Sequence, residues 1–188
     1  MIFFMRHGQS EHNLDEPKSF NLKNPKLTNK GKQNTRNMRG YIDDNSQFWV
    51  SPTVRTIETA LILHNNNQKI KSVDILAPRI YPHRKGEVNL CDQMIFTSNE
   101  KRVSFINFLD KKHPNDINDP EFIDLFQSFV KNYIKDDQNN IIITHDGVIA
   151  TLLKYYRNVN LERDKNNDLM LNNDIFHFTK DELLRESL

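Results

Sequence analysis

The sequence has a single cysteine, Cys91, among its 188 residues, so it cannot form an internal disulfide bond. This absence argues against a small secreted scaffold. A chain of this length can bury a hydrophobic core that is stable without disulfide bonds. No Asn-x-Ser/Thr acceptor for glycosylation occurs either. The apolar run in the opening MIFFMRHG is too short for a signal peptide or a membrane span. We therefore expect a cytoplasmic protein.

The sequence also lacks an excess of positive or negative charge. The chain carries 26 Lys and Arg against 25 Asp and Glu, which gives a formal net charge of +1. Bulk charge therefore does not favour a nucleic acid or an acidic membrane surface, and we expect neither as a partner. No repeat, low-complexity tract or linker divides the chain, so its length predicts one domain over residues 1–188.

Strand and helix signals alternate along the chain. Short apolar runs predict strands at Ile2–Met5, Gln47–Val50, Val73–Ala77, Asn140–Thr144 and Ile175–Phe178. Helices are expected at Thr28–Arg39, Thr53–His64, Ser98–Lys111, Pro120–Lys135 and Val148–Tyr156, with a long surface loop over 78–97. The aromatic stripe of the helix at Pro120–Lys135 is expected to face the core. This alternation predicts an α/β fold, a three-layer α/β/α sandwich with a mostly parallel central sheet.

Two histidines stand where predicted strands end. His7 follows Ile2–Met5 and Arg6, and His145 follows Asn140–Thr144. In open α/β sheets, ligands bind beyond the carboxyl ends of the strands. Arg55 falls in the helix after the strand at Gln47–Val50, at the same predicted edge. Two arginines and two histidines at one edge favour a phosphate group, because arginine offers it fork-shaped, charge-assisted hydrogen bonds.

Four motifs around these residues resemble the histidine phosphatase superfamily, the phosphoglycerate-mutase-like fold, in its RHG-motif branch. Residues 6–13 (RHGQSEHN) resemble its RHGxSxxN signature, and residues 27–33 (LTNKGKQ) resemble LTxxGxxQ. Residues 51–60 (SPTVRTIETA) are similar to SPxxR…TA, and residues 142–147 (IITHDG) to the strand that carries the second histidine of the family. The motifs occur in the order of the family and cover roughly residues 2–60 and 140–157.

The resemblance implies a covalent mechanism. His7 would attack phosphorus to form a phosphohistidine that water then hydrolyses. Arg6, Arg55 and His145 would hold the phosphoryl oxygens. Gly8 would let the backbone approach the phosphate, and Asn13 would add a neutral donor. Ser10 is a further candidate for substrate binding, or for shaping the loop.

The sequence departs from the family at the general acid. A glutamate is normal in a pattern like PxLrE, but residues 78–82 read PRIYP, which places Pro82 at its position. Glu87, five residues on, is the favoured replacement, with Asp146 and Asp92 as alternatives. Asp146 follows His145 as an acid does in the other branch of the superfamily, but it also suits the N-cap of the next helix.

Other polar residues have weaker signals. The predicted loop carries Arg79 and residues 83–85 (HRK), which could bind a second anionic group or simply be solvated. His12 lies at an open position of the signature and could approach the substrate. Cys91 has no partner motif and is given no role. No metal-ligand spacing accompanies the histidines, so neither a metal nor a cofactor is expected.

We therefore expect a phosphatase acting on a small phosphorylated substrate. Two alternatives stay open: a phosphoglycerate-mutase-type phosphotransferase, and a catalytically impaired relative that binds phosphate. The first is less favoured because 188 residues leave little room for the insertions of dedicated mutases. The second draws its support from the missing glutamate.

Overall fold

The computed structural model describes residues 1–15, 18–64, 69–80, 93–96, 99–110, 112–161 and 170–185. Its strands are β1 (Ile2–Arg6), β2 (Gln47–Val50), β3 (Ile70–Val73), β4 (Val103–Ile106), β5 (Asn140–Thr144) and β6 (Ile175–Phe178). Its α-helices are α1 (Asn29–Met38), α2 (Val54–Leu63), α3 (Asp119–Tyr133), α4 (Asp146–Arg157) and α5 (Lys180–Leu183). Short 3₁₀ turns include η1 (Glu11–Asn13), η2 (Lys18–Asn21), η3 (Arg39–Tyr41) and η4 (Asp74–Leu76).

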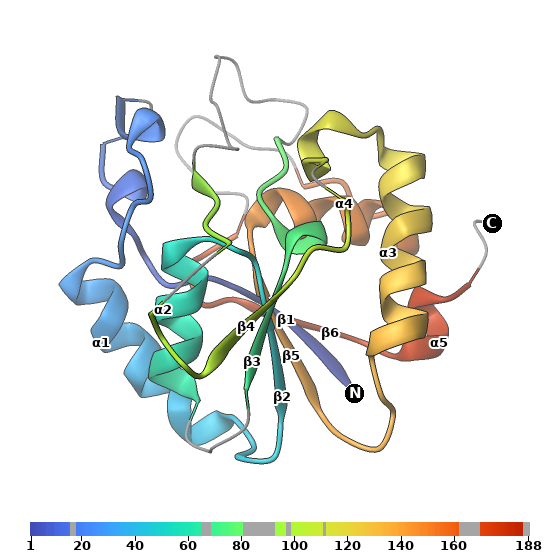
Figure 1. Cartoon of the computed structure of the whole chain (residues 1–188), viewed down its shortest axis with the longest axis horizontal. Helices are drawn as coiled ribbons and strands as arrows, with labels where there is room; N and C mark the ends of the chain where they lie inside the picture. The colour runs from blue at the N-terminus through green and yellow to red at the C-terminus, as the bar shows by residue number, and fades with distance from the viewer. Residues whose placement is uncertain are drawn as a thin grey trace.

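The six strands form one sheet in the order β4-β3-β2-β5-β1-β6. Five are parallel to their neighbours, and β6 pairs antiparallel with β1 at the edge. Helices α1 and α2 lie on one side of the sheet, and α3, α4 and α5 lie on the other (Figure 1). This is the expected three-layer α/β/α sandwich.

The central strands are buried on both faces, which explains why they appear in the sequence as continuous apolar runs. Ile142 of β5 packs in the core cluster that contains α3 and α4, whereas Ile141 and Ile143 pack in the cluster that contains α2. The expected aromatic stripe of α3 does face the core, since Phe122, Phe126 and Phe129 are fully buried; its neighbours Leu125 and Tyr133 pack against the same cluster.

The predicted helix over Ser98–Lys111 is wrong. Within it lies β4, which pairs in parallel with β3. Val103 and Phe105 pack toward the α2 side, while Ile106 packs toward the α3 side. That alternation has the period of a strand, and the two sides of the sheet select it over a helix.

Two other expectations need correction. The predicted strand at Val73–Ala77 lies too late in the chain, because β3 ends at Val73 and η4 follows. The carboxylate of Asp74 accepts hydrogen bonds from the backbone N–H groups of Phe108 and Leu109, at 3.0 and 2.9 Å, and this holds the turn. In addition, α5 was not expected at all. The part of the predicted loop at residues 81–92, and therefore Glu87, Cys91 and Asp92, lies outside the described residues.

Candidate active site

Three neighbouring strands deliver polar side chains to one edge of the sheet. Arg6 of β1 lies opposite Thr144 of β5, and β2 flanks β5 on its other side. His7, His145 and Ser51 are the residues that directly follow these three strands. They therefore meet at the carboxyl edge, as their positions in the sequence predict. The ring centroids of His7 and His145 are 5.1 Å apart.

Arg55 connects the two histidines from the first turn of α2. Its Nε donates to Nε2 of His7, and its Nη2 lies within hydrogen-bonding distance of Nδ1 of His145, at 3.2 Å in both cases. Only 2% of Arg55 is exposed. Because a guanidinium can only donate, each of these two ring nitrogens must carry a lone pair.

These contacts define the tautomer of His7. Its Nδ1 lies 2.7 Å from the carbonyl oxygen of Gly8, which can only accept, so Nδ1 carries the proton. Burial lowers the pKa of His7 well below its ordinary value of 6.5, and the positive charges of Arg55 and Arg6 act in the same direction. His7 is therefore neutral near pH 7, with the Nε2 lone pair directed at Arg55.

His145 has the opposite tautomer. Since its Nδ1 accepts from Arg55, its proton sits on Nε2 and is donated to Oγ of Ser51 at 2.9 Å. Burial lowers the pKa of His145 well below 6.5, and the charge of Arg55 contributes in the same sense. Ser51 belongs to the SPxxR motif, but nothing in the sequence indicates that it orients His145.

Gly8 lies where the chain passes close to α1 and α2. Its N–H donates to Oγ1 of Thr59 at 3.0 Å. A Cβ on Gly8 would lie 2.6 Å from Oγ1 of Thr35, a distance that real Cβ atoms do not tolerate. Packing against Thr35 therefore requires glycine at this position of the signature, and the absence of a side chain also leaves room for a ligand.

Asn13 belongs to η1, in the segment that follows His7. Its Oδ1 accepts from the backbone N–H and the hydroxyl of Ser10, at 3.1 and 3.2 Å, and Nδ2 of Asn172 lies at 3.5 Å. These contacts fix the orientation of the amide. The Nδ2 of Asn13 is buried and has no hydrogen-bond partner among the described residues. A buried donor without a partner is costly, so an anionic ligand here would satisfy it.

His12 lies beside the nucleophile candidate. Its ring centroid is 5.5 Å from that of His7, and its Nδ1 lies 2.7 Å from Oγ of Ser10. Ser10 therefore shapes the loop through both Asn13 and His12. The side chain of Asn172, which donates to the carbonyl oxygen of His7 at 3.1 Å, comes from 165 residues away. No pattern in the sequence could have indicated that contact.

Asp146 contacts Arg6 and does not cap α4. The N-cap of α4 is His145, and Asp146 is the first helical residue, which corrects the expected N-cap. Its Oδ2 lies 3.6 Å from Nη2 of Arg6, and its Oδ1 accepts from the N–H of Gly147 at 2.8 Å. Arg6 also donates to the carbonyl oxygen of Met170. Asp146 is therefore placed to orient Arg6.

The remaining candidates lie elsewhere. Arg79 is buried, donates to the carbonyl oxygens of Pro114 and Ile117, and pairs with Asp119 at 2.6 Å. It anchors the segment before α3 and does not project as a free cation. Residues 83–85 lie outside the described part of the chain. Within the described part, no group of three His, Cys, Asp or Glu side chains is placed to hold a metal ion.

The family model of the histidine phosphatase superfamily (branch 1) matches residues 2–179. The chain belongs to this superfamily. No curated protein sequence matches it. In the described residues, no helix is both long and apolar enough to cross a membrane.

Solved structures of similar fold include the ecdysone phosphate phosphatase of Bombix mori in complex with tungstate, at 18% identity and a TM-score of 0.56, covering 93% of this chain and 86% of that one. TTHB049 from Thermus thermophilus matches at 15% identity and a TM-score of 0.52, covering 82% and 84%. A phosphoglycerate mutase from the same organism has 17% identity, a TM-score of 0.47 and coverage of 83% and 84%. The first two similarities show the fold of the superfamily.

Proposed function

We propose that this member of the histidine phosphatase superfamily hydrolyses a phosphomonoester through a phosphohistidine on His7. The single observation that carries the proposal is the state of His7: a neutral ring whose Nδ1 proton is held by the Gly8 carbonyl and whose Nε2 lone pair lies 3.2 Å from Arg55 Nε. A nucleophile needs an available lone pair, and this tautomer supplies it on the nitrogen that faces Arg55.

In the first step, Nε2 of His7 forms a bond to phosphorus while the bond from phosphorus to the ester oxygen breaks. The leaving oxygen takes the bonding electron pair and needs a proton. In the second step, water attacks the phosphohistidine and gives one proton to the carboxylate that the acid left behind, the N–P bond breaks, and inorganic phosphate leaves with the His7 lone pair restored. Neither step calls for a metal or a cofactor.

The phosphoryl oxygens would be held by fixed positive charge. Arg6 and Arg55 supply two guanidinium groups, buried to 1 and 2% exposure, where electrostatic attraction is stronger than in water. The Nδ2 of Asn13 would add a neutral donor. The ecdysone phosphate phosphatase of similar fold holds tungstate, a tetrahedral oxyanion like phosphate, which is consistent with an oxyanion pocket.

A carboxyl group from residues 81–92 would protonate the leaving oxygen. We keep Glu87 as the proposed acid and Asp92 as an alternative, although both lie outside the described residues. The contact between Asp146 and Arg6, with 3.6 Å between Oδ2 and Nη2, supports a positioning role for Asp146 rather than that of the acid.

Trapping the intermediate tests the proposal. The enzyme is mixed with a ³²P-labelled phosphomonoester, quenched in alkali, and analysed for acid-labile label on the protein. We expect label and turnover in the wild type, neither in His7→Ala, and both in the control His177→Ala, whose side chain is exposed on β6. Unchanged phosphate release by His7→Ala would refute the mechanism. Accumulation of a bisphosphate in a single turnover would instead identify a mutase.

A further inference from the structure

The near-zero net charge conceals a strong separation of charge along the chain. Residues 18–42, here called the basic segment, contain seven Lys and Arg and no Asp or Glu. The other residues contain 19 Lys and Arg against 25 Asp and Glu, a formal charge of −6. The cations of the basic segment are Lys18, Lys23, Lys26, Lys30, Lys32, Arg36 and Arg39. The summed charge therefore does not exclude a polyanionic partner.

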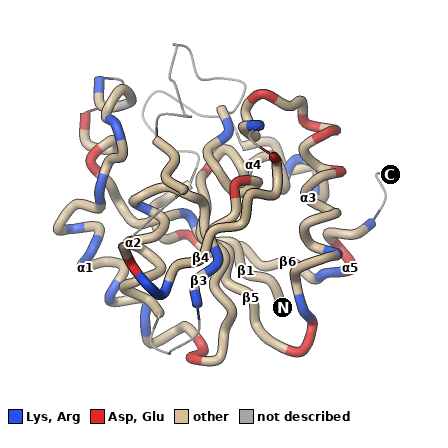
Figure 2. Tube along the Cα trace, in the orientation of Figure 1, with Lys and Arg blue, Asp and Glu red and all other residues tan. Residues whose placement is uncertain are grey.

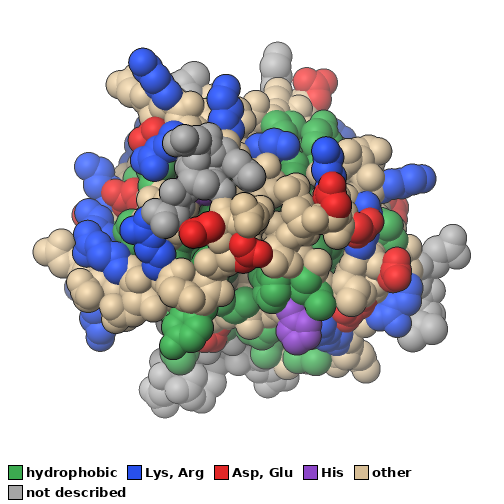
Figure 3. Space-filling view, turned by 90° about the horizontal axis from the view of Figure 1, so that it is seen from below, with side chains coloured by type: hydrophobic (Ala, Val, Ile, Leu, Met, Phe, Trp, Pro, Cys, Tyr) green, Lys and Arg blue, Asp and Glu red, His purple; other side chains and the backbone are tan. Residues whose placement is uncertain are grey.

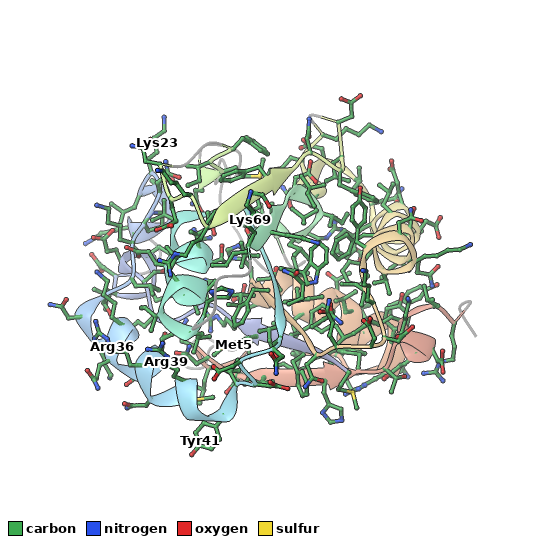
Figure 4. The ribbon with its side chains drawn as sticks, turned by 60° about the horizontal axis from the view of Figure 1, so that its bottom comes forward. Met5, Lys23, Arg36, Arg39, Tyr41 and Lys69 are labelled. Atoms are coloured by element: carbon green, nitrogen blue, oxygen red, sulfur yellow. The ribbon has the colours of Figure 1, made fainter. Side chains whose placement is uncertain are left out.

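The fold places the basic segment on one flank of the molecule. It runs through η2, the following loop, α1 and η3, on the side opposite α3 (Figure 1). The trace along α1 carries Lys and Arg without Asp or Glu (Figure 2), and basic side chains gather on the same side in the space-filling view (Figure 3). Figure 4 shows Lys23, Arg36 and Arg39 along this flank, with Tyr41 at its lower end.

Several of these cations face solvent without a neutralising charge. Lys23, Lys30 and Arg36 are all exposed, and none makes an ion pair with a carboxylate among the described residues. Lys32 and Arg36 are four residues apart, so they lie next to each other on the helix surface. Like charges at that spacing destabilise a helix, and a bound polyanion would remove the penalty.

The uncharged side chains on the flank indicate which polyanion fits. Between its cations, α1 exposes only amides, namely Asn29, Gln33, Asn34 and Asn37; the exposed large apolar side chains of the basic segment are Leu22 and Tyr41, one before and one after this helix. An anionic bilayer is bound most firmly where apolar side chains enter it, which this helix does not offer. Lys, Arg, Asn and Gln are instead the side chains that contact a nucleic-acid backbone. Tyr41, 82% exposed, presents a ring on which a base can stack.

We propose that the basic segment binds single-stranded nucleic acid through its phosphate backbone, independently of base sequence. The surface does not involve His7, Arg6, Arg55 or His145. The proposal of nucleic-acid binding is therefore independent of the proposed phosphatase activity.

The test compares two triple variants that lose the same charge. Lys23→Gln/Lys30→Gln/Arg36→Gln neutralises the basic segment, and Lys131→Gln/Lys135→Gln/Lys154→Gln neutralises three exposed lysines near α3 and α4. Binding to a fluorescein-labelled single-stranded RNA of mixed sequence, about 20 nucleotides long, is measured by anisotropy between roughly 50 and 200 mM salt. Vesicles containing phosphatidylserine and a poly-glutamate peptide are the competing probes.

We expect the wild type to bind with micromolar affinity at about 50 mM salt and to weaken steeply as salt rises. The basic-segment variant should bind at least about 10-fold more weakly. Its plot of log affinity against log salt concentration should be about 2 units shallower, because the variant loses three cations and each phosphate contact on a single strand releases about 0.7 counterions. The control variant at Lys131, Lys135 and Lys154 should keep the salt dependence of the wild type. Both variants should keep phosphatase turnover. Absence of RNA binding at low salt, equal loss in both variants, or preferential binding to vesicles or poly-glutamate would overturn the proposal.

Discussion

Arg55 holds both histidines of the site at once: its Nε is 3.2 Å from Nε2 of His7, and its Nη2 is 3.2 Å from Nδ1 of His145. The lone pair that accepts from Arg55 is the same one that would attack phosphorus. In the proposed mechanism, Arg55 would therefore release His7 and turn its N–H groups to the phosphoryl oxygens as the substrate binds. One guanidinium would thus orient the nucleophile before the reaction and stabilise charge during it.

Replacing Arg55 with lysine separates charge from geometry. An ammonium keeps the positive charge but cannot reach both histidines from fixed directions, so we expect kcat/KM for p-nitrophenyl phosphate to fall by roughly 10²–10³. Arg36→Lys, at an exposed position of α1, is the matched control and should keep full turnover. Equal kcat/KM in the two variants would show that charge alone suffices at position 55.

The contact of Asp146 with Arg6 predicts how Asp146→Asn behaves toward different leaving groups. If Asp146 positions Arg6, the loss of kcat should be similar for a phenyl phosphate and for an alkyl phosphate. An acid matters most when the leaving group is poor, so loss of the acid would affect the alkyl phosphate by about 10²–10⁴ and the aryl ester much less. The same pair of substrates applied to Glu87→Gln should show that selective loss. A selective loss in Asp146→Asn instead would assign the acid to Asp146.

The sequence indicated the strand-end residues correctly because the rule behind them is local. His7 and His145 follow continuous apolar runs, and such runs form buried parallel strands whose carboxyl ends share an edge. β4 was missed because its half-buried residues show no clear periodicity until β3 lies beside them. The approach of Asn172 to His7 depends on the path of a distant segment that no local pattern encodes.

At Gly31, helix propensity alone predicts the wrong sign for the change in stability on substitution by alanine. Glycine inside a helix costs about 1 kcal/mol relative to alanine, so Gly31→Ala in α1 would ordinarily stabilise the protein. A Cβ here would lie 2.0 Å from the backbone oxygen of Gln9, which cannot move without displacing the loop that carries His7. We therefore expect a loss of about 1–3 kcal/mol in the free energy of unfolding by urea, together with lower turnover.

Gly40 is the matched control for that substitution. Apart from its neighbours along the chain, no atom lies within 4 Å of the position that its Cβ would take. Gly40→Ala should leave stability unchanged or raise it by up to about 1 kcal/mol. If Gly31→Ala proved as well tolerated as Gly40→Ala, close packing of α1 against the Gln9 backbone would not be what requires glycine there.

Acid should destabilise the protein through its buried histidines. Burial lowers the pKa values of His7, His145, His64 and His113 below the ordinary 6.5, so the folded state resists protons that the unfolded chain accepts. Below about pH 6.5 the unfolded state binds more protons, and stability must fall as pH falls. Each such histidine contributes a slope of up to about 1.4 kcal/mol per pH unit until its own folded-state pKa is reached.

Urea unfolding at about pH 7.5, 6.5 and 5.5 measures this dependence, and His64 offers the cleanest variant because it lies outside the active site. Both of its ring nitrogens are buried and lack a hydrogen-bond partner among the described residues, and its ring packs edge-on against Phe48 at 5.1 Å. His64→Phe removes the titrating group while keeping an aromatic ring, so it should flatten the fall in stability on the acid side. Since Arg55 lies at the other end of α2, turnover at neutral pH should not change. A pH slope identical to that of the wild type would mean that the pKa of His64 is the same in the folded and unfolded protein, contrary to the lowering expected from its burial beside Arg102.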